Sequence, residues 1–278
     1  MKNNEETVKK AIESILNQDF PDKFMEIIVV DGESKDKTLS IVMDSVLDNA
    51  MKVKIYSDGG KGLSEARQIV VNNAEGEYIV WVDGDVVVPK DFVRKQVEFM
   101  EQNPRVGIAV GKFGYKEGTL VATLQSLRHY TGNRFTGNDA TICRIEALRQ
   151  VGGFDIHMKG ACEDLDLMTR IKARGWALSV NEKAKFYHAC KEAWRDLWTE
   201  QNWFGYGGHY VWHKHKGLFA LWDKVPLLIF LGAFKKAVRA YKMMHQKKSF
   251  LIPLAMLFEN IAWWFGFAKA HMDNYGHN

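Results

Sequence analysis

Hydrophobic positions recur along the first part of the chain with two periods, which predict alternating helices and strands. Residues 8–16 carry apolar side chains at helical spacing, whereas residues 26–30 form a short apolar run of strand length. The predicted elements, in chain order, are helix 8–16, strand 26–30, helix 39–46, strand 53–56, a helix ending at residue 73, and strand 78–86. This alternation predicts an α/β fold in which a mixed, mostly parallel sheet is flanked by helices.

The pattern continues through the middle of the chain. Pro89 opens a further helix, and Gly175 ends another. The remaining predicted elements are strand 106–113, helix 120–130, a short strand after the loop 136–141, helix 146–151, a helix through residues 165–171, and strand 185–187. The last of these strands delivers His188 at its end.

The apolar run Tyr78–Val82 ends in Asp83-Gly84-Asp85. Open α/β sheets bind ligands at the carboxyl ends of their strands. Gly84 allows a tight turn, so that both carboxylates face one small volume. Two acids held that close repel each other unless a cation lies between them, and oxygen ligands suit Mg²⁺ or Mn²⁺. The alternative is an ordinary surface turn, because Asp-Gly is a common turn pair.

Two loops before this strand have the composition of a nucleotide site. Asp31 and Glu33 follow the first strand, where acids bind a ribose or a base edge in other α/β folds. Capping of the next helix by Ser34 or Asp36 is the competing interpretation. Lys61, Gly62 and Arg67 lie in and after a glycine-rich loop at a helix start, which is a plausible cradle for a diphosphate, although most such loops are only turns.

Further candidates follow later in the chain. Glu163 and Asp164 stand at the start of a predicted helix, where a carboxylate can face a pocket. Asp166 in the same turn is explained by the helix dipole alone. His188 ends a strand, which favours a ligand role over the more common packed or exposed histidine.

The composition of the chain indicates the redox compartment in which it works and the kind of surface that it binds. The three cysteines are odd in number and fit no zinc pattern, which suggests a reducing compartment, and no signal peptide is expected. The net charge is only +4, but residues 209–250 carry many lysines and arginines and only one acid, Asp223. Such a segment seeks an anionic surface, either lipid headgroups or nucleic acid.

The C-terminal region combines apolar, aromatic and basic residues. Residues 225–231 form an apolar run too short to span a bilayer, and residues 250–272 form a borderline run that Glu259 and Asn260 interrupt. Seven of the nine tryptophans follow Cys190. This mixture predicts helices lying on an anionic membrane surface rather than a nucleic-acid site. The alternative is packing on the preceding domain or on a second subunit. We expect domains at 1–215 and 216–278 and a peripheral location on the cytoplasmic face of the cell membrane.

Taken together, these motifs resemble family 2 inverting glycosyltransferases with the GT-A fold, a Rossmann-like sheet. The resemblance covers about residues 3–215 in the family's order. The matching motifs are residues 26–31 with Ser34 and Asp36, residues 62–67, Asp83-Gly84-Asp85, Val151-Gly152-Gly153-Phe154-Asp155, Glu163-Asp164-Leu165-Asp166, Tyr187-His188, and residues 201–207.

The resemblance implies a role for several of these residues. Asp31 would contact the nucleoside base, and Asp83 the ribose or the metal. Asp85 would bind the metal that holds the donor diphosphate, with His188 as a further metal or diphosphate contact. Asp164 would be the general base that deprotonates the acceptor hydroxyl. Family members usually begin with a buried strand before the Asn-Asn-Glu loop, and in this chain Met1 falls just before that loop, so we expect this strand to be missing.

The sequence therefore predicts a metal-dependent inverting glycosyltransferase that uses a nucleotide-sugar donor and Mg²⁺ or Mn²⁺. The expected acceptor is a lipid-linked saccharide or a growing glycan. Three alternatives stay open: sugar transfer to a polyprenyl phosphate, a sugar nucleotidyltransferase, and a non-catalytic nucleotide-sugar binding subunit. A phosphate acceptor is already ionised and needs no base, so the Glu163-Asp164 pair argues against the first.

Overall fold

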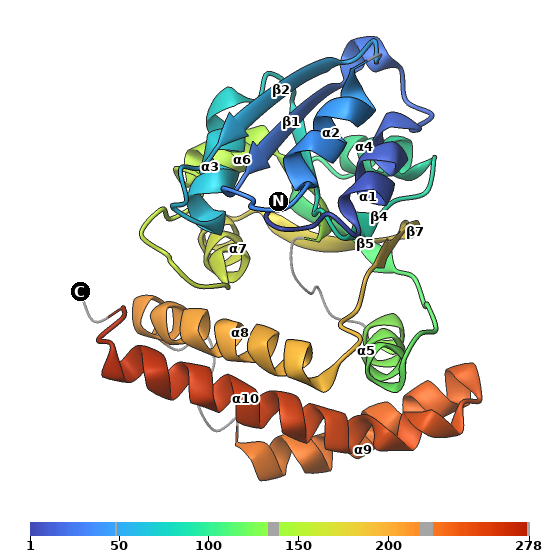
Figure 1. Ribbon diagram of the computed structural model, residues 1–278, viewed down its shortest axis with the longest axis vertical. Coiled ribbons are helices and arrows are strands. Elements are labelled where there is room, and N and C mark those ends of the chain that lie inside the picture. Colours follow the sequence, from blue (N-terminus) through green and yellow to red (C-terminus); the bar gives the residue numbers. More distant parts are fainter. Residues whose placement is uncertain (48, 133–138, 217–224, 277–278) are drawn as a thin grey trace. The chain divides into compact units, whose positions relative to one another are not determined.

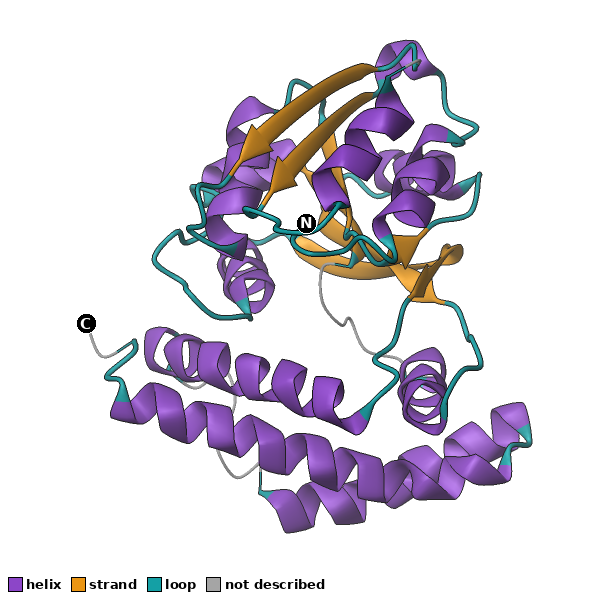
Figure 2. Ribbon diagram, in the orientation of Figure 1, coloured by secondary structure: helices purple, strands orange, loops and turns teal. Residues whose placement is uncertain are grey.

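The computed structural model describes residues 1–47, 49–132, 139–216 and 225–276 (Figures 1 and 2). These residues form two compact units. The first unit contains Met1–Phe113, Phe135–Lys159 and Glu163–Ala189, and the second contains Gly114–Arg134, Gly160–Cys162 and Cys190–Asn278. The helix 194–214 belongs to the second unit, whereas the sequence pattern places it in the domain 1–215.

A two-stranded parallel sheet opens the first unit. β1 (Glu26–Asp31) pairs with β2 (Lys52–Ser57), and Asp31 lies opposite Ser57 at their carboxyl ends. The apolar faces of α1 (Val8–Leu16) and α2 (Thr38–Val46) bury Val8, Ile12 and Val42 in one cluster with β1. The turn η1 (Asp22–Phe24) connects α1 to β1. The local apolar pattern thus builds this layer as predicted.

A five-stranded sheet forms the rest of the framework. Its order is β3-β6-β5-β7-β4. The strands are β3 (Tyr78–Val82), β4 (Val86–Val87), β5 (Val106–Phe113), β6 (Ala140–Arg144) and β7 (Ala177–His188). Only β5 and β7 run parallel, whereas β3–β6, β5–β6 and β4–β7 are antiparallel. The predicted mixed sheet with flanking helices is confirmed, but its pairs are not mostly parallel, because β6 returns between β3 and β5 in the opposite direction.

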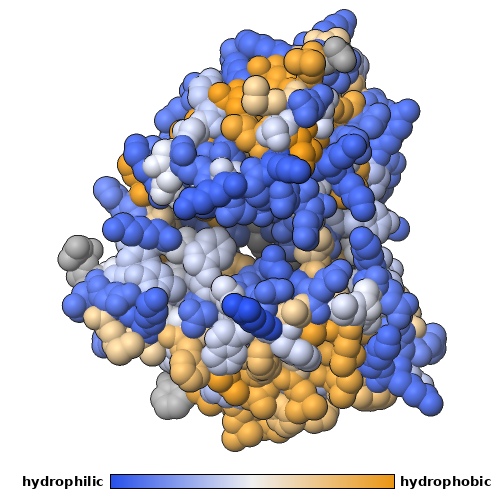
Figure 3. Space-filling view, in the orientation of Figure 1, coloured by the Kyte–Doolittle hydropathy of each residue, from blue (hydrophilic) through white to orange (hydrophobic). Residues whose placement is uncertain are grey.

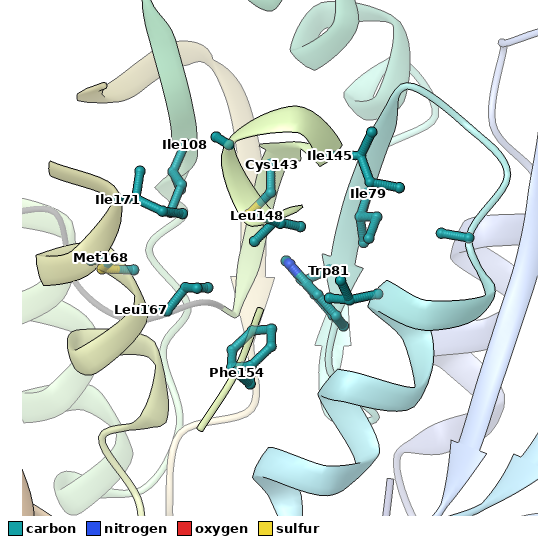
Figure 4. Close-up of a cluster of buried hydrophobic side chains, with 13 residues drawn as sticks. Ile79, Trp81, Ile108, Cys143, Ile145, Leu148, Phe154, Leu167, Met168 and Ile171 are labelled. Carbon is teal, nitrogen blue, oxygen red and sulfur yellow. The ribbon is translucent and has the colours of Figure 1, made fainter. Parts of the chain in front are cut away.

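Helices α3 (Leu63–Asn73), α4 (Phe92–Gln102), α6 (Ile145–Gln150) and α7 (Glu163–Ala173) complete this unit. The main apolar cluster joins β3 to α6 and α7, as Figure 4 shows for Trp81, Phe154, Leu148, Leu167 and Ile171. Burial of one such side chain stabilises the fold by about 1.5–3 kcal/mol. This cluster fixes β3 and the start of α7, and both elements carry candidate site residues.

Between β1 and β3 lies an apolar cavity of about 500 Å³. Residues of both strands line it, and a smaller cavity of about 140 Å³ continues along the same strands to Met1. Among the described residues, β1 pairs only with β2 and β3 only with β6, so no strand joins β1 to β3 across the cavity. The Met1 ammonium group donates to the Val30 carbonyl at 2.9 Å, and the Gly32 amide donates to the Met1 carbonyl at 2.8 Å, which continues strand pairing at one end of β1.

The second unit is helical. It contains α5 (Leu120–Thr131), α8 (Trp194–Lys214), α9 (Pro226–Met244), the turn η3 (Lys247–Leu251) and α10 (Ile252–Met272). The helices α8 and α10 pack so closely that a Cβ on Gly205 would lie 1.8 Å from the Trp263 carbonyl oxygen, and one on Gly266 would lie 1.8 Å from that of Asn202. Glycine at these positions lets the two helix backbones touch.

The polar residues that interrupt α10 are explained by this packing. Glu259 is buried and forms an ion pair with Arg128 of α5. Among the described residues, Lys247–Met272 is the one stretch that is long and apolar enough to cross a bilayer, and half of its most apolar window is buried inside the protein. Lys224 and Asp223 of the predicted basic segment lie outside the described residues.

Candidate active site

The pairing of β4 with β7 brings two of the predicted ligands together. Val86 lies opposite His188, and the amide of Ala189 donates to the Asp85 carbonyl at 3.0 Å. As a result, His188 Nε2 lies 3.3 Å from Asp85 Oδ2, and both side chains are about one-fifth exposed. The structure therefore brings Asp85 and His188 together, and their shared role as metal ligands stays a prediction.

Asp83 faces the other way, toward the predicted phosphate-cradle arginine. Both Asp83 oxygens lie 3.4 Å from Arg67, and the second branch of the Arg67 guanidinium is paired with the buried Glu163. The guanidinium also lies over the rings of Trp81 and Phe154. Burial opposes the charge on Arg67, but the carboxylates of Glu163 and Asp83 raise its pKa above the usual range. Arg67 thus links the end of β3 to the start of α7.

Gly84 has a different role from the one expected. Its φ is not positive, but a Cβ there would lie 3.2 Å from the side chain of Asn4. The hydroxyl of Thr7 also donates to the Gly84 carbonyl at 2.8 Å. The glycine therefore permits the close approach of the Asn4 loop to the turn that carries Asp83 and Asp85.

The two predicted catalytic acids differ in accessibility. Glu163 is buried against Arg67, whereas Asp164 is partly exposed and accepts a hydrogen bond from the Leu165 amide at 2.7 Å. Burial raises the pKa of both carboxyls, and Arg67 opposes that rise. Asp166 is fully buried and paired with Arg170 at 2.6 Å. A raised pKa and partial exposure suit a proton acceptor, so Asp164 has the better geometry for that role.

The residues predicted to contact a nucleoside lie at the carboxyl ends of β1 and β2. The carboxylate of Asp31 accepts from the Ser34 amide at 3.0 Å and from its hydroxyl at 2.6 Å. Glu33, in a left-handed conformation with φ 60°, accepts from the Ser57 hydroxyl. Asp31 thus shapes its own loop by holding Ser34, and the side chain of Lys37, the N-cap residue of α2, makes no capping hydrogen bond.

The glycine-rich loop is organised by an acid that sequence reasoning missed. Asp58 is buried and accepts from the amides of Gly60 at 2.7 Å and Gly62 at 3.2 Å. Gly62 has φ 104° and immediately precedes α3. Lys61 is exposed and lies 3.4 Å from Glu65. The sequence feature that could have indicated this role is the position of Asp58 directly before two glycines.

A second acid, Asp139, is predicted from the sequence only as part of the loop 136–141. Asp139 precedes β6, and its carbonyl accepts from the Asp83 amide at 3.4 Å. The pKa of Asp139 is raised to about 7, chiefly by burial and also by the carboxylates of Asp83, Asp164 and Asp85, while His188 opposes the rise. Asp139 lies opposite the end of β3. This position follows only from the antiparallel pairing of β3 with β6, so the sequence alone does not place Asp139 at the site.

Two family models match the chain. The model described as Glycosyl transferase family 2 matches residues 1–154, more than half of the 278 residues, and the model described as Glycosyl transferase family group 2 matches residues 78–270. The two matches together include the acids at the ends of β1 and β3, the start of α7 and His188.

Curated relatives are more distant. The chain is 23% identical over 223 residues to a poly-beta-1,6-N-acetyl-D-glucosamine synthase of Staphylococcus epidermidis, which covers 75% of this chain and 53% of that protein. It is 25% identical over 225 residues to a beta-monoglucosyldiacylglycerol synthase of Synechocystis, covering 75% of this chain and 46% of that protein. The chain thus spans about half the length of these relatives.

Solved structures show the fold. The mannosyltransferase PcManGT from Pyrobaculum calidifontis, in complex with GDP-Man and Mn²⁺, superposes with a TM-score of 0.70 at 15% identity over 98% of this chain and 85% of that one. S. aureus TarS in complex with UDP-GlcNAc superposes with a TM-score of 0.55 at 16% identity over 98% and 90% of the two chains. Fold, motifs and family models agree: the chain belongs to glycosyl transferase family 2 and has the GT-A fold.

Proposed function

We propose that this chain transfers a sugar from a nucleotide-sugar donor to an acceptor hydroxyl, with inversion and with the help of a divalent cation. The observation that carries the proposal is the pair Asp85–His188, 3.3 Å apart, beside the network of Asp83, Arg67 and Glu163. Support comes from the relatives' names, which describe glycosyl transfer, and from the Mn²⁺ and nucleotide sugars of the superposed structures.

The residues present fit a divalent cation. Asp85 offers a carboxylate oxygen and His188 an imidazole nitrogen, at a separation that two neighbouring ligands of one ion have. Mg²⁺ and Mn²⁺ complete such partial protein sites with water and substrate phosphates. A cation held there would offset the charge that grows on the departing nucleoside diphosphate.

The remaining residues bind the donor and move one proton. Asp31 and Glu33 face the nucleoside, while Lys61 lies on the diphosphate side. Asp164 accepts the proton of the acceptor hydroxyl as the new bond to the anomeric carbon forms and the bond to the diphosphate breaks, with the electron pair leaving on the diphosphate. Glu163 positions Arg67 rather than contacting the acceptor.

We also propose that the second unit holds the protein on the cytoplasmic, anionic face of a membrane, where the acceptor is lipid-linked or part of a growing glycan. The observation behind this is α9, which buries only Ala233, Ala237 and Ala240. Its exposed apolar residues are Leu227, Leu228, Leu231, Phe234, Val238 and Met243. Figure 3 shows the apolar surface over α9 and α10.

Basic residues lie on the same helix. Lys235, Lys236, Arg239 and Lys242 are placed along α9, and each lysine or arginine near an anionic surface contributes about 1 kcal/mol to binding. Liposome flotation across a salt series, with and without anionic lipid, tests this. Salt should release only part of the protein, because the apolar contacts remain. Equal partitioning of the full chain and of Leu231→Lys/Phe234→Lys would contradict the proposal.

The test of the activity is a screen of nucleotide sugars by thermal shift with and without Mn²⁺, followed by product analysis. A bound donor raises the melting temperature, because it binds the native state only. Release of a nucleoside diphosphate supports the proposal. Release of pyrophosphate would identify a nucleotidyltransferase, transfer only to a polyprenyl phosphate would identify that class, and binding without turnover would identify a binding subunit.

A further inference from the structure

Three histidines meet in the second unit, where α8 and α10 pack together. His209 and His213 lie one turn apart on α8, and His271 lies in the last turn of α10. One ring nitrogen from each residue lies within 4.8 Å of the other two. His209 is fully buried, His213 is partly buried and His271 is exposed. The cluster therefore has an inner wall and an open side toward solvent.

The tautomer of the innermost ring follows from its contacts. His209 Nδ1 lies 2.6 Å from the carbonyl oxygen of Tyr275, which can only accept a hydrogen bond. Nδ1 therefore carries the proton and donates it, which leaves a lone pair on Nε2 when the ring is neutral. That Nε2 lies 3.3 Å from His271 Nδ1. The lone pair thus points toward the other histidines of the cluster.

One pair of nitrogens in the cluster has the spacing of a metal site held by imidazoles. Two nitrogens that bind zinc at about 2.0–2.1 Å in a tetrahedron lie about 3.3 Å apart, which is the separation of His209 Nε2 and His271 Nδ1, and the nitrogen of His213 lies within 4.8 Å of the others. A ligating histidine usually donates its other ring N–H to a carbonyl or a carboxylate, as His209 does to Tyr275. Imidazole nitrogen suits zinc and neighbouring transition metals better than magnesium.

A purely structural explanation accounts for less of the arrangement. His271 Nδ1–H can donate to His209 Nε2, but that bond involves two of the three rings. The His213 ring lies 4.5 Å from that of His209, centroid to centroid, and a ligand atom of His213 is still within 4.8 Å of both others. Three basic rings repel one another when protonated, whereas a metal binds all three in the neutral form.

We propose that His209, His213 and His271 bind one zinc ion, with a water on the open side as fourth ligand. The ion joins the C-terminal end of α8 to the last turn of α10 and to the Tyr275 carbonyl. It acts as a brace within the second unit, and its all-nitrogen ligand set differs from the carboxylate-containing pair Asp85–His188. Zinc binding at this cluster does not depend on the proposed function.

The test uses the full chain stripped of metal with a chelator and kept in excess Mg²⁺. Zinc titration by calorimetry should show one tight site, and Co²⁺ in its place should give the intense visible absorption of tetrahedral cobalt. At a zinc concentration about 100 times the Kd, the melting temperature should rise by about 5–10 °C.

Substitutions of single histidines test which residues bind the zinc ion. His271→Gln and His213→Gln should each weaken zinc binding at least about 100-fold and abolish the cobalt spectrum. His271 is exposed, so its replacement leaves the fold intact. His245→Asn is the matched control: this exposed histidine follows α9 in a left-handed conformation that asparagine tolerates, and zinc binding should not change.

Measuring both transfer activity and zinc binding distinguishes the histidine cluster from the pair Asp85–His188. Asp85→Asn should bind zinc like the unaltered chain, whatever its effect on transfer. Absence of a stoichiometric zinc site in the unaltered chain would overturn the proposal and leave a packed histidine cluster. Zinc binding that persists unchanged in both His271→Gln and His213→Gln would overturn it as well.

Discussion

In the first unit, charged side chains lie in the interior: Arg67 is buried between Glu163 and Asp83, and Asp166 is buried against Arg170. In the second unit, α9 places three alanines inside and its leucines and phenylalanines outside. Burying charge costs stability unless each group is paired. Exposing large apolar side chains also costs stability, unless a further surface covers them. The two costs thus differ in kind: buried, paired charge in the first unit and exposed apolar side chains on α9 in the second.

The largest expected effect concerns Asp85, the proposed metal ligand in the first unit. Asp85→Asn removes a charged ligand and should lower transfer by more than about 10³-fold, while the melting temperature stays within about 2 °C. Product release measured across a Mn²⁺ series checks this. Asp22→Asn, an exposed acid in η1, is the control and should retain activity. Full activity of the unaltered chain in excess EDTA would rule out the metal role.

The second-largest expected effect is that of Asp164→Asn. It should keep donor affinity and lower kcat by about 10²–10⁴-fold, the share that a general base usually contributes. Glu163→Gln separates the two neighbouring acids: it leaves Arg67 without its buried partner, so the melting temperature should fall as well. If Asp164→Asn instead lost donor affinity and kept its turnover number, Asp164 would belong to the donor site.

The pH dependence of kcat tests the same general-base role of Asp164. Asp164 accepts a proton only when ionised, and burial raises its pKa above the ordinary 3.8. The acid limb of kcat should therefore lie at a higher pH than for an exposed aspartate, and kcat should fall about tenfold per pH unit below it. A profile of kcat at saturating donor, measured from about pH 4 to about pH 8, checks this. A limb at or below the ordinary value would contradict the burial of this group.

A glycine pair tests the packing of the second unit. Gly205→Ala places a Cβ 1.8 Å from the Trp263 carbonyl oxygen and should destabilise the chain by about 1–3 kcal/mol. Gly232→Ala on α9 meets no atom within 4 Å and should stabilise it by up to about 1 kcal/mol. Urea unfolding followed by tryptophan fluorescence measures both. Equal effects of the two substitutions would show that α8 and α10 do not pack this closely.

The sequence predicted those features that depend on local pattern. Strand 106–113 was placed at its observed bounds, and the acids after β1 and β3 lie at strand ends as expected. The strand ending at His188 was predicted to begin at residue 185, but β7 begins at Ala177, because polar residues such as Asn181 and Glu182 interrupt its apolar pattern. Long alternating strands of this kind are hard to recognise without their neighbours.

Features that depend on distant pairing were missed. Asp139 joins the site only because β6 runs antiparallel to β3, and Arg67 was assigned to the donor phosphates although it is buried between Glu163 and Asp83. The sequence pattern places α8 in the domain 1–215, whereas α8 packs on α10, which follows it by several dozen residues, and no local signal reports that contact.

The cavity between β1 and β3 has a consequence for how this protein behaves in concentrated solution. The two strands that border it present main-chain amides and carbonyls to a gap rather than to a neighbouring strand. Such edges accept any extended segment that reaches them, including one from another molecule, and so favour strand exchange and aggregation. Amide hydrogens on these edges should also exchange with deuterium sooner than those of β5 and β6.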